Sequence, residues 1–224
     1  MTMKGKGILG MWIDLLPETV DECDNWHIRE HIPERIDVPG FNRARRYIAL
    51  EGTPRYHAMY ETDAIETLAT PAYTNITAKP TDWAMRMRKD YRNAHRGVFR
   101  VTGSVGRGFG GCIASIRFAP QDGKAEGLRS WLLGETLPAL IEERCVLGAH
   151  LWESDPALRA ELTAKRAAGR DDKVVDWVLT VEATQRREIE DALKAKLPGD
   201  TLVQRGAKPG YDTGIYQFLF GMTE

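Results

Sequence analysis

An internal repeat is the feature that most constrains how this chain can fold. The segment that begins at Trp26 aligns without a gap with the segment that begins at Trp131, 105 residues later. The alignment also matches Pro33 with Pro138, and a similar apolar stretch precedes it in each copy. A repeat of this kind indicates two related units that bury a shared interior.

The 224 residues therefore divide into an N-terminal unit, 1–105, and a C-terminal unit, 106–224. Apolar periodicity and turn residues predict the order strand, helix, strand, strand, helix, strand in each unit. The first unit is expected to contain strand 7–15, helix 18–37, strands 43–50 and 55–62, a helical region 64–92 and strand 96–104. The second is expected to contain strand 111–119, helix 124–143, strands 146–153 and 173–183, helix 184–196, strand 213–221 and an additional charged helix, 156–168.

This order predicts an α+β architecture. The βαββαβ pattern is the ferredoxin-like unit, an antiparallel sheet with helices on one face. Two such units in tandem can bury their uncovered sheet faces against each other, which gives an intramolecular dimeric α/β barrel. The glycine-rich stretch 103–111 is expected to be a flexible connector, because its spacing matches no phosphate-binding loop. Pro33 and Pro138 are expected to bend or end their helices.

Composition excludes several classes of function. The chain has 31 basic and 32 acidic side chains, which argues against a dedicated nucleic-acid-binding protein. The basic segment 86–96 is accordingly expected to be a solvated helical face. No apolar run approaches the roughly 18–20 residues that cross a membrane, so a cytoplasmic protein is expected. The three cysteines form no CxxC pair and indicate neither a disulfide framework nor a structural zinc site.

A polar stripe distinguishes the first unit from the second. His27, His31 and Arg35 are spaced four residues apart, so a regular helix would align them on one side. Their counterparts in the repeat are Leu132, Thr136 and Leu140. Because these counterparts are mostly apolar, the stripe is expected to face inward and line a pocket. The alternative is a surface stripe paired with Glu30 and Glu34.

The stripe suits proton transfer on a substrate that develops negative charge. His31 is the expected acid or base, with His27 or Asp14 as a second proton carrier, since histidine titrates near neutral pH. Arg35 would hold a carboxylate or enolate through charge-assisted hydrogen bonds. Asp14 also aligns with Arg117 of the second unit, so an ion pair between them is the alternative for Asp14.

Further candidates lie on the neighbouring predicted elements. The expected substrate-binding residues are Tyr47, Arg46, His57, Tyr60, Trp12 and Trp83. The alternative is a role in core packing, which is the commoner one for tyrosine, histidine and tryptophan residues of this kind. Residues 27–31 also spell HxxEH, the motif of inverted zinc proteases, but Pro33 would disturb that helix. No metal and no other cofactor are expected.

The segment around the stripe resembles a known family. The residues Trp26-x4-His31-x-Pro33-x5-Pro39-Gly40-Phe41, followed by Arg46-Tyr47, are similar to the EthD-like branch of the dimeric α/β-barrel superfamily. This resemblance implies a ligand pocket between a sheet and its helices. Relatives include cofactor-free decarboxylases, cyclases, lactone isomerases and quinone-forming monooxygenases, and more distant members bind haem. The second unit has Thr136 in place of the histidine and Arg144-Cys145 in place of Pro-Gly, so the chemistry is expected in the first unit.

Residues and resemblance together favour a cofactor-independent lyase or isomerase that acts on a small aromatic or polyketide-like carbonyl or carboxylate compound. Decarboxylation is the narrower expectation, because it needs a carboxylate anchor and a proton donor. A cofactor-free monooxygenase of phenolic substrates and a non-catalytic small-molecule-binding accessory protein are the alternatives. The expected partner is the small-molecule substrate, and both a monomer and a homodimer agree with paired units.

Overall fold

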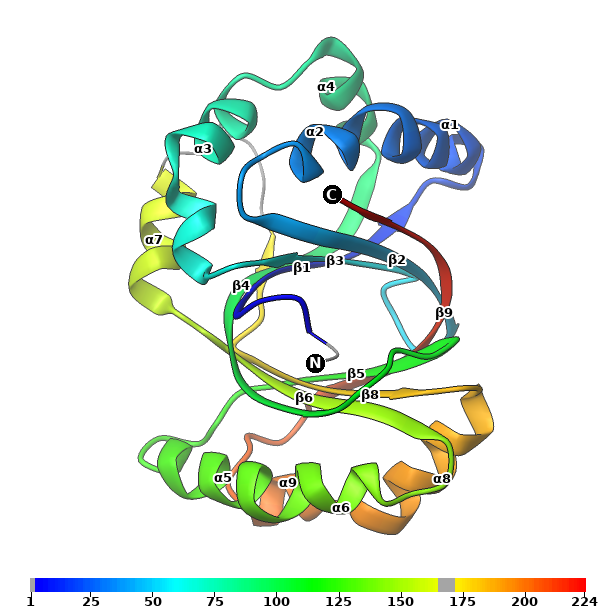
Figure 1. The fold of residues 1–224 in the computed structure, drawn as a ribbon, viewed down its shortest axis with the longest axis vertical. Coiled ribbons are helices and arrows are strands. Elements are labelled where there is room, and N and C mark those ends of the chain that lie inside the picture. Colours follow the sequence, from blue (N-terminus) through cyan, green and yellow to red (C-terminus); the bar gives the residue numbers. More distant parts are fainter. Residues whose placement is uncertain (1–2, 165–171) are drawn as a thin grey trace.

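The computed structural model describes residues 3–164 and 172–224, which form a closed barrel with helices on two sides (Figure 1). Neighbouring strands follow the order β1-β3-β2-β9-β5-β8-β6-β4, and β4 pairs back with β1 to close the barrel. All of these pairings are antiparallel. The short strand β7 (Lys173–Val174) adds to β4 in parallel.

Each unit follows the expected βαββαβ order. The N-terminal unit contains β1 (Gly7–Leu15), α1 (Val20–Trp26), α2 (Pro33–Ile36), β2 (Phe41–Glu51), β3 (Tyr56–Thr62), α3 (Pro71–Ala78), α4 (Asp82–Lys89) and β4 (Tyr91–Gly106). The C-terminal unit contains β5 (Cys112–Phe118), α5 (Ala125–Trp131), α6 (Leu137–Ile141), β6 (Val146–Ser154), α7 (Pro156–Ala164), β7, β8 (Trp177–Ala183), α8 (Arg186–Lys196), α9 (Thr201–Gln204) and β9 (Asp212–Thr223). The units join along β2–β9 and β4–β6, which confirms the predicted fold class.

The connector between the units is shorter than the glycines predict. β4 continues through Gly106, where Gly103 pairs with Leu151 and Gly106 with Gly148. The glycines serve this strand: a Cβ on Gly103 would lie 2.3 Å from the Leu133 side chain, and Gly106 has φ +96°. Only 107–111 connects the units, so the predicted flexible stretch is wrong over its first four residues. Part of the predicted helix 156–168 lies outside the described residues.

Both long helices contain a π-helical turn next to the repeated proline. The turns span His27–His31 and Leu132–Thr136. In the first, the Ile32 N–H donates to the His27 carbonyl, 3.0 Å away, five residues back instead of four. The ring of Pro33 would clash with the carbonyl of an ordinary α-helix four residues earlier, and the wider turn removes that clash. The predicted interruption of the regular helix is thus confirmed in both units.

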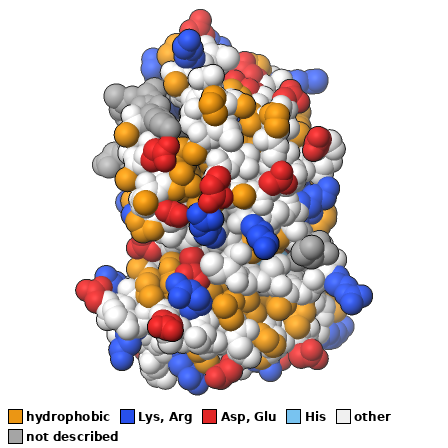
Figure 2. All heavy atoms as spheres, turned by 60° about the vertical axis from the view of Figure 1, so that its left-hand side comes forward, with side chains coloured by type: hydrophobic (Ala, Val, Ile, Leu, Met, Phe, Trp, Pro, Cys, Tyr) orange, Lys and Arg blue, Asp and Glu red, His pale blue; other side chains and the backbone are white. Residues whose placement is uncertain are grey.

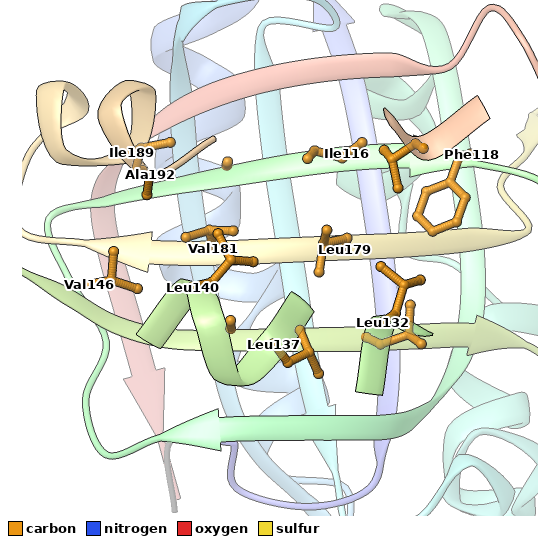
Figure 3. Packing of buried hydrophobic residues seen from close by; sticks show 14 of the residues in the cluster. Ile116, Phe118, Leu132, Leu137, Leu140, Val146, Leu179, Val181, Ile189 and Ala192 are labelled. Atoms are coloured by element: carbon orange, nitrogen blue, oxygen red, sulfur yellow. The ribbon is translucent and has the colours of Figure 1, made fainter. Parts of the chain in front are cut away.

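The C-terminal unit fills the space between its helices and its sheet with apolar side chains. Leu132, Leu137 and Leu140 pack against Leu179 and Val181 of the sheet (Figure 3). Leu132 and Leu140, the counterparts of His27 and Arg35, are fully buried, and Thr136 is buried as well. The positions of the stripe therefore face inward in this unit.

Replacing Leu140 by Ala is expected to lower the free energy of unfolding by about 2–5 kcal/mol, because the lost methyl groups leave a cavity in this core. Urea denaturation measures the effect. Leu50→Ala is the control, since Leu50 is 40% exposed and its truncation is expected to change stability by about 0.5 kcal/mol or less. A loss below about 1 kcal/mol for Leu140→Ala would contradict this packing.

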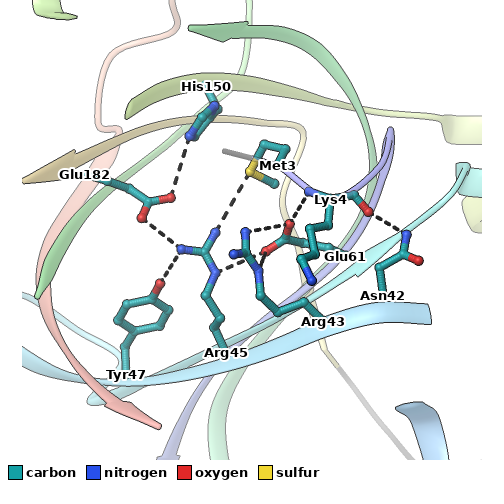
Figure 4. Close-up of polar contacts among 9 residues, drawn as sticks. All are labelled: Met3, Lys4, Asn42, Arg43, Arg45, Tyr47, Glu61, His150 and Glu182. Carbon is teal, nitrogen blue, oxygen red and sulfur yellow. Dashed lines mark hydrogen bonds and ion pairs between the residues drawn. The ribbon is translucent and has the colours of Figure 1, made fainter. Parts of the chain in front are cut away.

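The barrel interior holds a buried ionic network that links the two units (Figure 4). Arg45 of β2 donates from Nε to Glu61 Oε1, at 3.1 Å, and from Nη1 to Glu182 Oε2, at 2.8 Å. The same Nη1 is 2.8 Å from the Tyr47 hydroxyl, and His150 Nε2 lies 3.6 Å from Glu182 Oε1. One guanidinium therefore neutralises carboxylates from both sheets.

The surface carries charges of both signs. Figure 2 shows Lys and Arg side chains interspersed with Asp and Glu over one face, among scattered apolar side chains. Within the described ranges, none of the helices is long and apolar enough to span a membrane.

Candidate active site

A cavity of about 320 Å³ lies between the sheet of the N-terminal unit and the helices that cover it. Its floor is formed by β1 and β3, and its walls by the first π-helical turn, α2, α3, α4 and the start of β4. The lining residues are Leu9, Met11, Ile13, His27, His31, Arg35, Ala58, Tyr60, Tyr73, Thr77, Pro80, Met85, Arg88, Lys89, Tyr91 and Arg96. All belong to the N-terminal unit, whereas apolar side chains fill the corresponding space in the other unit.

The lining combines cations with aromatic and apolar side chains. Arg35, Arg88, Lys89 and Arg96 all line the cavity, and among the described residues the lining contains no Asp or Glu. Such a surface favours a ligand that carries negative charge and has an apolar body, because a buried cation needs a compensating anion.

Arg35 is the most deeply buried of these cations, with 3% of its surface exposed. Its Nη1 donates to the His31 carbonyl, at 2.8 Å, and to Glu34 Oε2, at 3.2 Å. Nε and Nη2 have no hydrogen-bond partner within the described part of the chain. These two nitrogens share one edge of the planar guanidinium, the edge that binds two oxygen atoms of an anion side by side.

His27 is held neutral by its neighbours. Its Nδ1–H donates to the Cys23 carbonyl, at 2.7 Å, because a carbonyl can only accept. Its Nε2 accepts from Arg46 Nη1, at 3.2 Å, and Arg46 also donates to Asp24, at 2.7 Å. Burial, and then the positive charge of Arg46, lower the pKa of His27 well below its usual value. Both ring nitrogens are thus engaged, which suits a residue that positions others.

The ring of His27 is expected to stay neutral at the pH where an ordinary histidine takes up its proton, and NMR of its ring carbons and protons would measure this. The unfolded chain takes up this proton near pH 6.5, and the folded chain does so only at a lower pH. Stability is therefore expected to fall as the pH drops below about 6.5. Removing the cation with Arg46→Met is expected to raise the pKa of His27. A wild-type His27 that titrates above pH 6 would contradict the arrangement.

His31 also lines the cavity. Its ring packs on Trp26, with 4.1 Å between centroids, and its edge faces Tyr60 at 6.4 Å. Trp26 Nε1 donates to Glu30 Oε1, at 2.9 Å, and Thr81 donates to the same oxygen, at 2.5 Å. This contact ties the start of α4 to the π-helical turn. Burial raises the pKa of Tyr60 to about 12, although the charge of Arg35 opposes the shift.

Three of the predicted binding residues face the barrel interior instead of the cavity. Trp12, Tyr47 and His57 are fully buried there, and the rings of Trp12 and His57 stack at 4.5 Å. Successive side chains of a strand point to opposite faces, so Tyr47 and Arg46 cannot both face one pocket. The same rule puts His57 and Tyr60 on opposite faces of β3. Burial lowers the pKa of His57 to about 3.

The remaining predicted residues also lie away from the cavity lining. Asp14 accepts from the Arg55 backbone N–H, at 2.6 Å, and from the Asn93 amide, at 3.3 Å, near one end of the barrel. Trp83 donates from Nε1 to Glu22, at 3.1 Å, outside the lining. The predicted direct pair of Asp14 with Arg117 is replaced by other contacts, because the Arg117 guanidinium reaches the Thr53 carbonyl instead.

Several lining residues are not predicted by the sequence patterns. Arg88, Lys89 and Arg96 belong to the basic segment that was expected to be a solvated helical face. That expectation is wrong in part, because α4 ends at Lys89 and the chain continues as β4 from Tyr91. The segment thereby turns three of its cations towards the cavity. Tyr73, on α3, had no signal in the sequence beyond its helical position.

The zinc-protease motif is not assembled as a metal site. Among the described residues, no group of three His, Cys, Asp or Glu side chains is placed to hold a metal ion. The Arg46 guanidinium sits 3.2 Å from His27 Nε2, where a metal ion would have to bind.

Comparison with solved structures identifies the same fold. An anthrone oxidase-like protein matches with a TM-score of 0.68 and 10% sequence identity, over 100% of this chain and 95% of that one. A candidate monooxygenase from Fusobacterium nucleatum matches with a TM-score of 0.59 and 10% identity, over 99% and 96% of the two chains. One from Lactobacillus acidophilus matches with a TM-score of 0.57 and 9% identity, over 97% and 96%.

A further structure with this fold, from Listeria monocytogenes, is named as a ferredoxin-fold protein. At 8–10% identity these matches show the fold alone. No protein-family model matches the chain, and no curated protein matches its sequence.

Proposed function

We propose that this protein is a small-molecule oxygenase that oxidises an electron-rich phenol with O₂ and without a bound cofactor. The observation that carries the proposal is Arg35, buried at the cavity with its Nε–Nη2 edge available for an oxyanion. The monooxygenase-like and anthrone oxidase-like names of the similar structures support an oxygenase better than a lyase.

The residues would act by making and holding the substrate anion. His31 takes the proton from the phenol or its keto tautomer, and Arg35 stabilises the resulting oxyanion. The electron-rich anion is the species that reacts with O₂. In the net reaction a ring CH₂ group and O₂ give a C=O group and water, so one oxygen atom enters the substrate. His27 positions the turn that carries His31, and Tyr60 and Tyr73 bound the apolar part of the cavity.

The lyase or isomerase expectation shares this cavity, because Arg35 would hold a carboxylate equally well. It stays a prediction, and the oxygen requirement separates it from the proposal. Anthrone is a suitable first probe, since its enol tautomer is a phenol. Oxygen uptake with the purified protein is expected to equal the amount of quinone formed. Turnover that continues at the same rate under strict exclusion of O₂ would overturn the oxygenase.

His31→Ala is expected to lower kcat by about 100-fold, because a positioned acid or base contributes factors of this order. Arg29→Gln is the matched control, since Arg29 lies on the same turn and is exposed. Equal activity of His31→Ala and the wild type would remove His31 from the mechanism. Equal loss in both variants would point to a general disturbance of the turn.

A further inference from the structure

A second pocket, of about 180 Å³, lies at one end of the barrel. It is lined by residues of β4, β5, the segment around β7, and the start of β9. The lining residues are His95, Arg117, Phe118, Ala119, Lys173, Val174, Val175, Asp176 and Asp212. Most of them come from the C-terminal unit, and none of them lines the candidate active site.

Arg117 is the residue that makes this pocket unusual. Its side chain is 4% exposed, and its guanidinium lies over the ring of Trp12, 5.4 Å from the centroid. Nη2 donates to the Thr53 carbonyl, at 2.5 Å, and lies 3.6 Å from Asp212 Oδ2. Nε and Nη1 are buried and have no hydrogen-bond partner in the part of the chain that the structure describes. Burying a guanidinium whose N–H groups have no hydrogen-bond partner raises the free energy of the folded protein, unless a ligand supplies an acceptor.

The nearby carboxylates do not complete the coordination of Arg117. Asp176 is 3.3 Å from Arg159, and Asp14 accepts from the Arg55 backbone and Asn93. Asp212 is largely exposed and approaches Nη2 alone. Burial lowers the pKa of Arg117, which is the direction expected for a cation whose charge is incompletely compensated.

Lys173 adds a second positive charge to the same pocket. It is exposed, and its Nζ donates to Asn93 Oδ1, at 3.2 Å. His95 Nε2 contacts the same oxygen, at 3.3 Å, and burial, followed by the charges of Arg117 and Lys173, lowers the pKa of His95. The pocket thus presents one buried and one exposed cation around a space that fits a molecule of a few heavy atoms.

We propose that this pocket binds the carboxylate of a small organic acid through Arg117, with Lys173 as an outer contact. A carboxylate brings two acceptor oxygens for Nε and Nη1, which have no hydrogen-bond partner in the described part of the chain, and charge-assisted hydrogen bonds of this kind are strong. The site lies close to the candidate active site but faces the other way. His95 borders this pocket, and the next residue of β4, Arg96, borders the active-site cavity on the opposite face of the strand.

Titration of ¹⁵N-labelled protein with succinate, at constant ionic strength, tests the site. The Nε–H signal of Arg117 is expected to shift in a saturable manner, whereas added chloride leaves it unchanged. Absence of a saturable shift up to tens of millimolar succinate would overturn the proposal. Saturation by inorganic phosphate but not by succinate would overturn the assignment of a carboxylate.

Variants locate the binding. Arg117→Lys keeps the charge but changes the donor geometry, and is expected to weaken succinate binding at least tenfold. Lys173→Gln, an exposed change that leaves the barrel intact, is expected to weaken it about two- to fivefold. Lys208→Gln is the control, because Lys208 is an exposed cation that lies 3.2 Å from Asp122 and outside the pocket lining. If both Arg117→Lys and Lys173→Gln bind succinate as tightly as the wild type, the proposal is overturned. Lys173→Gln keeps this test valid if Arg117→Lys folds incompletely.

Discussion

Replacing Arg45 by Met is expected to lower the free energy of unfolding by about 3–5 kcal/mol, because a buried carboxylate is then left without its cation. Arg45 is the charged partner of Glu182, at 2.8 Å, and both side chains are essentially inaccessible to solvent. Glu61 keeps Arg43, at 2.8 Å, so the penalty falls mainly on Glu182. Chemical denaturation at neutral pH measures the loss.

The double variant Arg45→Met, Glu182→Leu is the sharper comparison. It removes both charges and is expected to be more stable than Arg45→Met alone, since no uncompensated buried charge remains. Disruption of the exposed pair of Arg186 with Glu190 is the control and is expected to change stability little, because water and salt screen an exposed ion pair. A double variant less stable than the single one would show that packing, not charge, governs this part of the barrel.

The same network makes the stability of the folded protein depend on pH in the acid range. Burial alone would raise the pKa of Glu182, but the Arg45 guanidinium outweighs burial and holds this pKa at about 2. The value in the folded chain is therefore below the usual 4.5. The stabilisation is complete above about pH 4.5 and is lost as the pH falls towards 2. In Arg45→Met this contribution to the acid transition is expected to disappear.

Replacing Arg35 by Gln is expected to lower kcat/KM for a phenolic substrate by about 100-fold, the equivalent of losing roughly 3 kcal/mol of charge-assisted hydrogen bonding to the oxyanion. The loss should fall mainly on kcat, because the negative charge forms on the substrate only after His31 removes its proton. Arg35→Lys retains the positive charge but lacks the Nε–Nη2 edge that can bind two oxygen atoms. It is expected to have a kcat/KM between those of Arg35→Gln and the wild type.

Stability and activity must be separated for this variant. Arg29→Gln, on the same turn but exposed, supplies the matched baseline for both measurements. A kcat/KM for Arg35→Gln equal to that of Arg29→Gln would exclude Arg35 as the anchor.

Most of the fold could be predicted from the internal repeat. Trp26 and Trp131 set the alignment of the units, and the apolar alternation of β1 predicted its bounds, 7–15, as they are observed. The paired prolines, Pro33 and Pro138, located the bends because a proline imposes the same backbone conflict in any helix. These effects depend only on residues close together in the chain, so they can be predicted from the sequence.

The site was harder to predict because it depends on which face of a strand meets the helices. The contrast of His27 and Arg35 with leucines correctly indicated inward positions. Neighbouring residues such as Arg46 and Tyr47 looked equally suitable, and only the register of the closed barrel assigns Tyr47 to the interior. The cations of 86–96 reach the cavity through a helix-to-strand transition that periodicity did not locate. Membership of the EthD-like branch stays a prediction.

The closure of the barrel has a consequence for how the chain is made. β2 completes its hydrogen bonding only with β9, and the pairing of Arg43 with Thr223 joins residues 180 positions apart. During synthesis the first sheet therefore leaves the ribosome with its inner face, including Arg45, Glu61 and Trp12, open to water until the last strand emerges. Contacts between residues so far apart in sequence slow folding. They also prolong the time for which unpaired, aggregation-prone strands are exposed to solvent. Closure of the barrel is thus expected to be a late step of folding, and the yield of folded protein is expected to depend on the supply of chaperones.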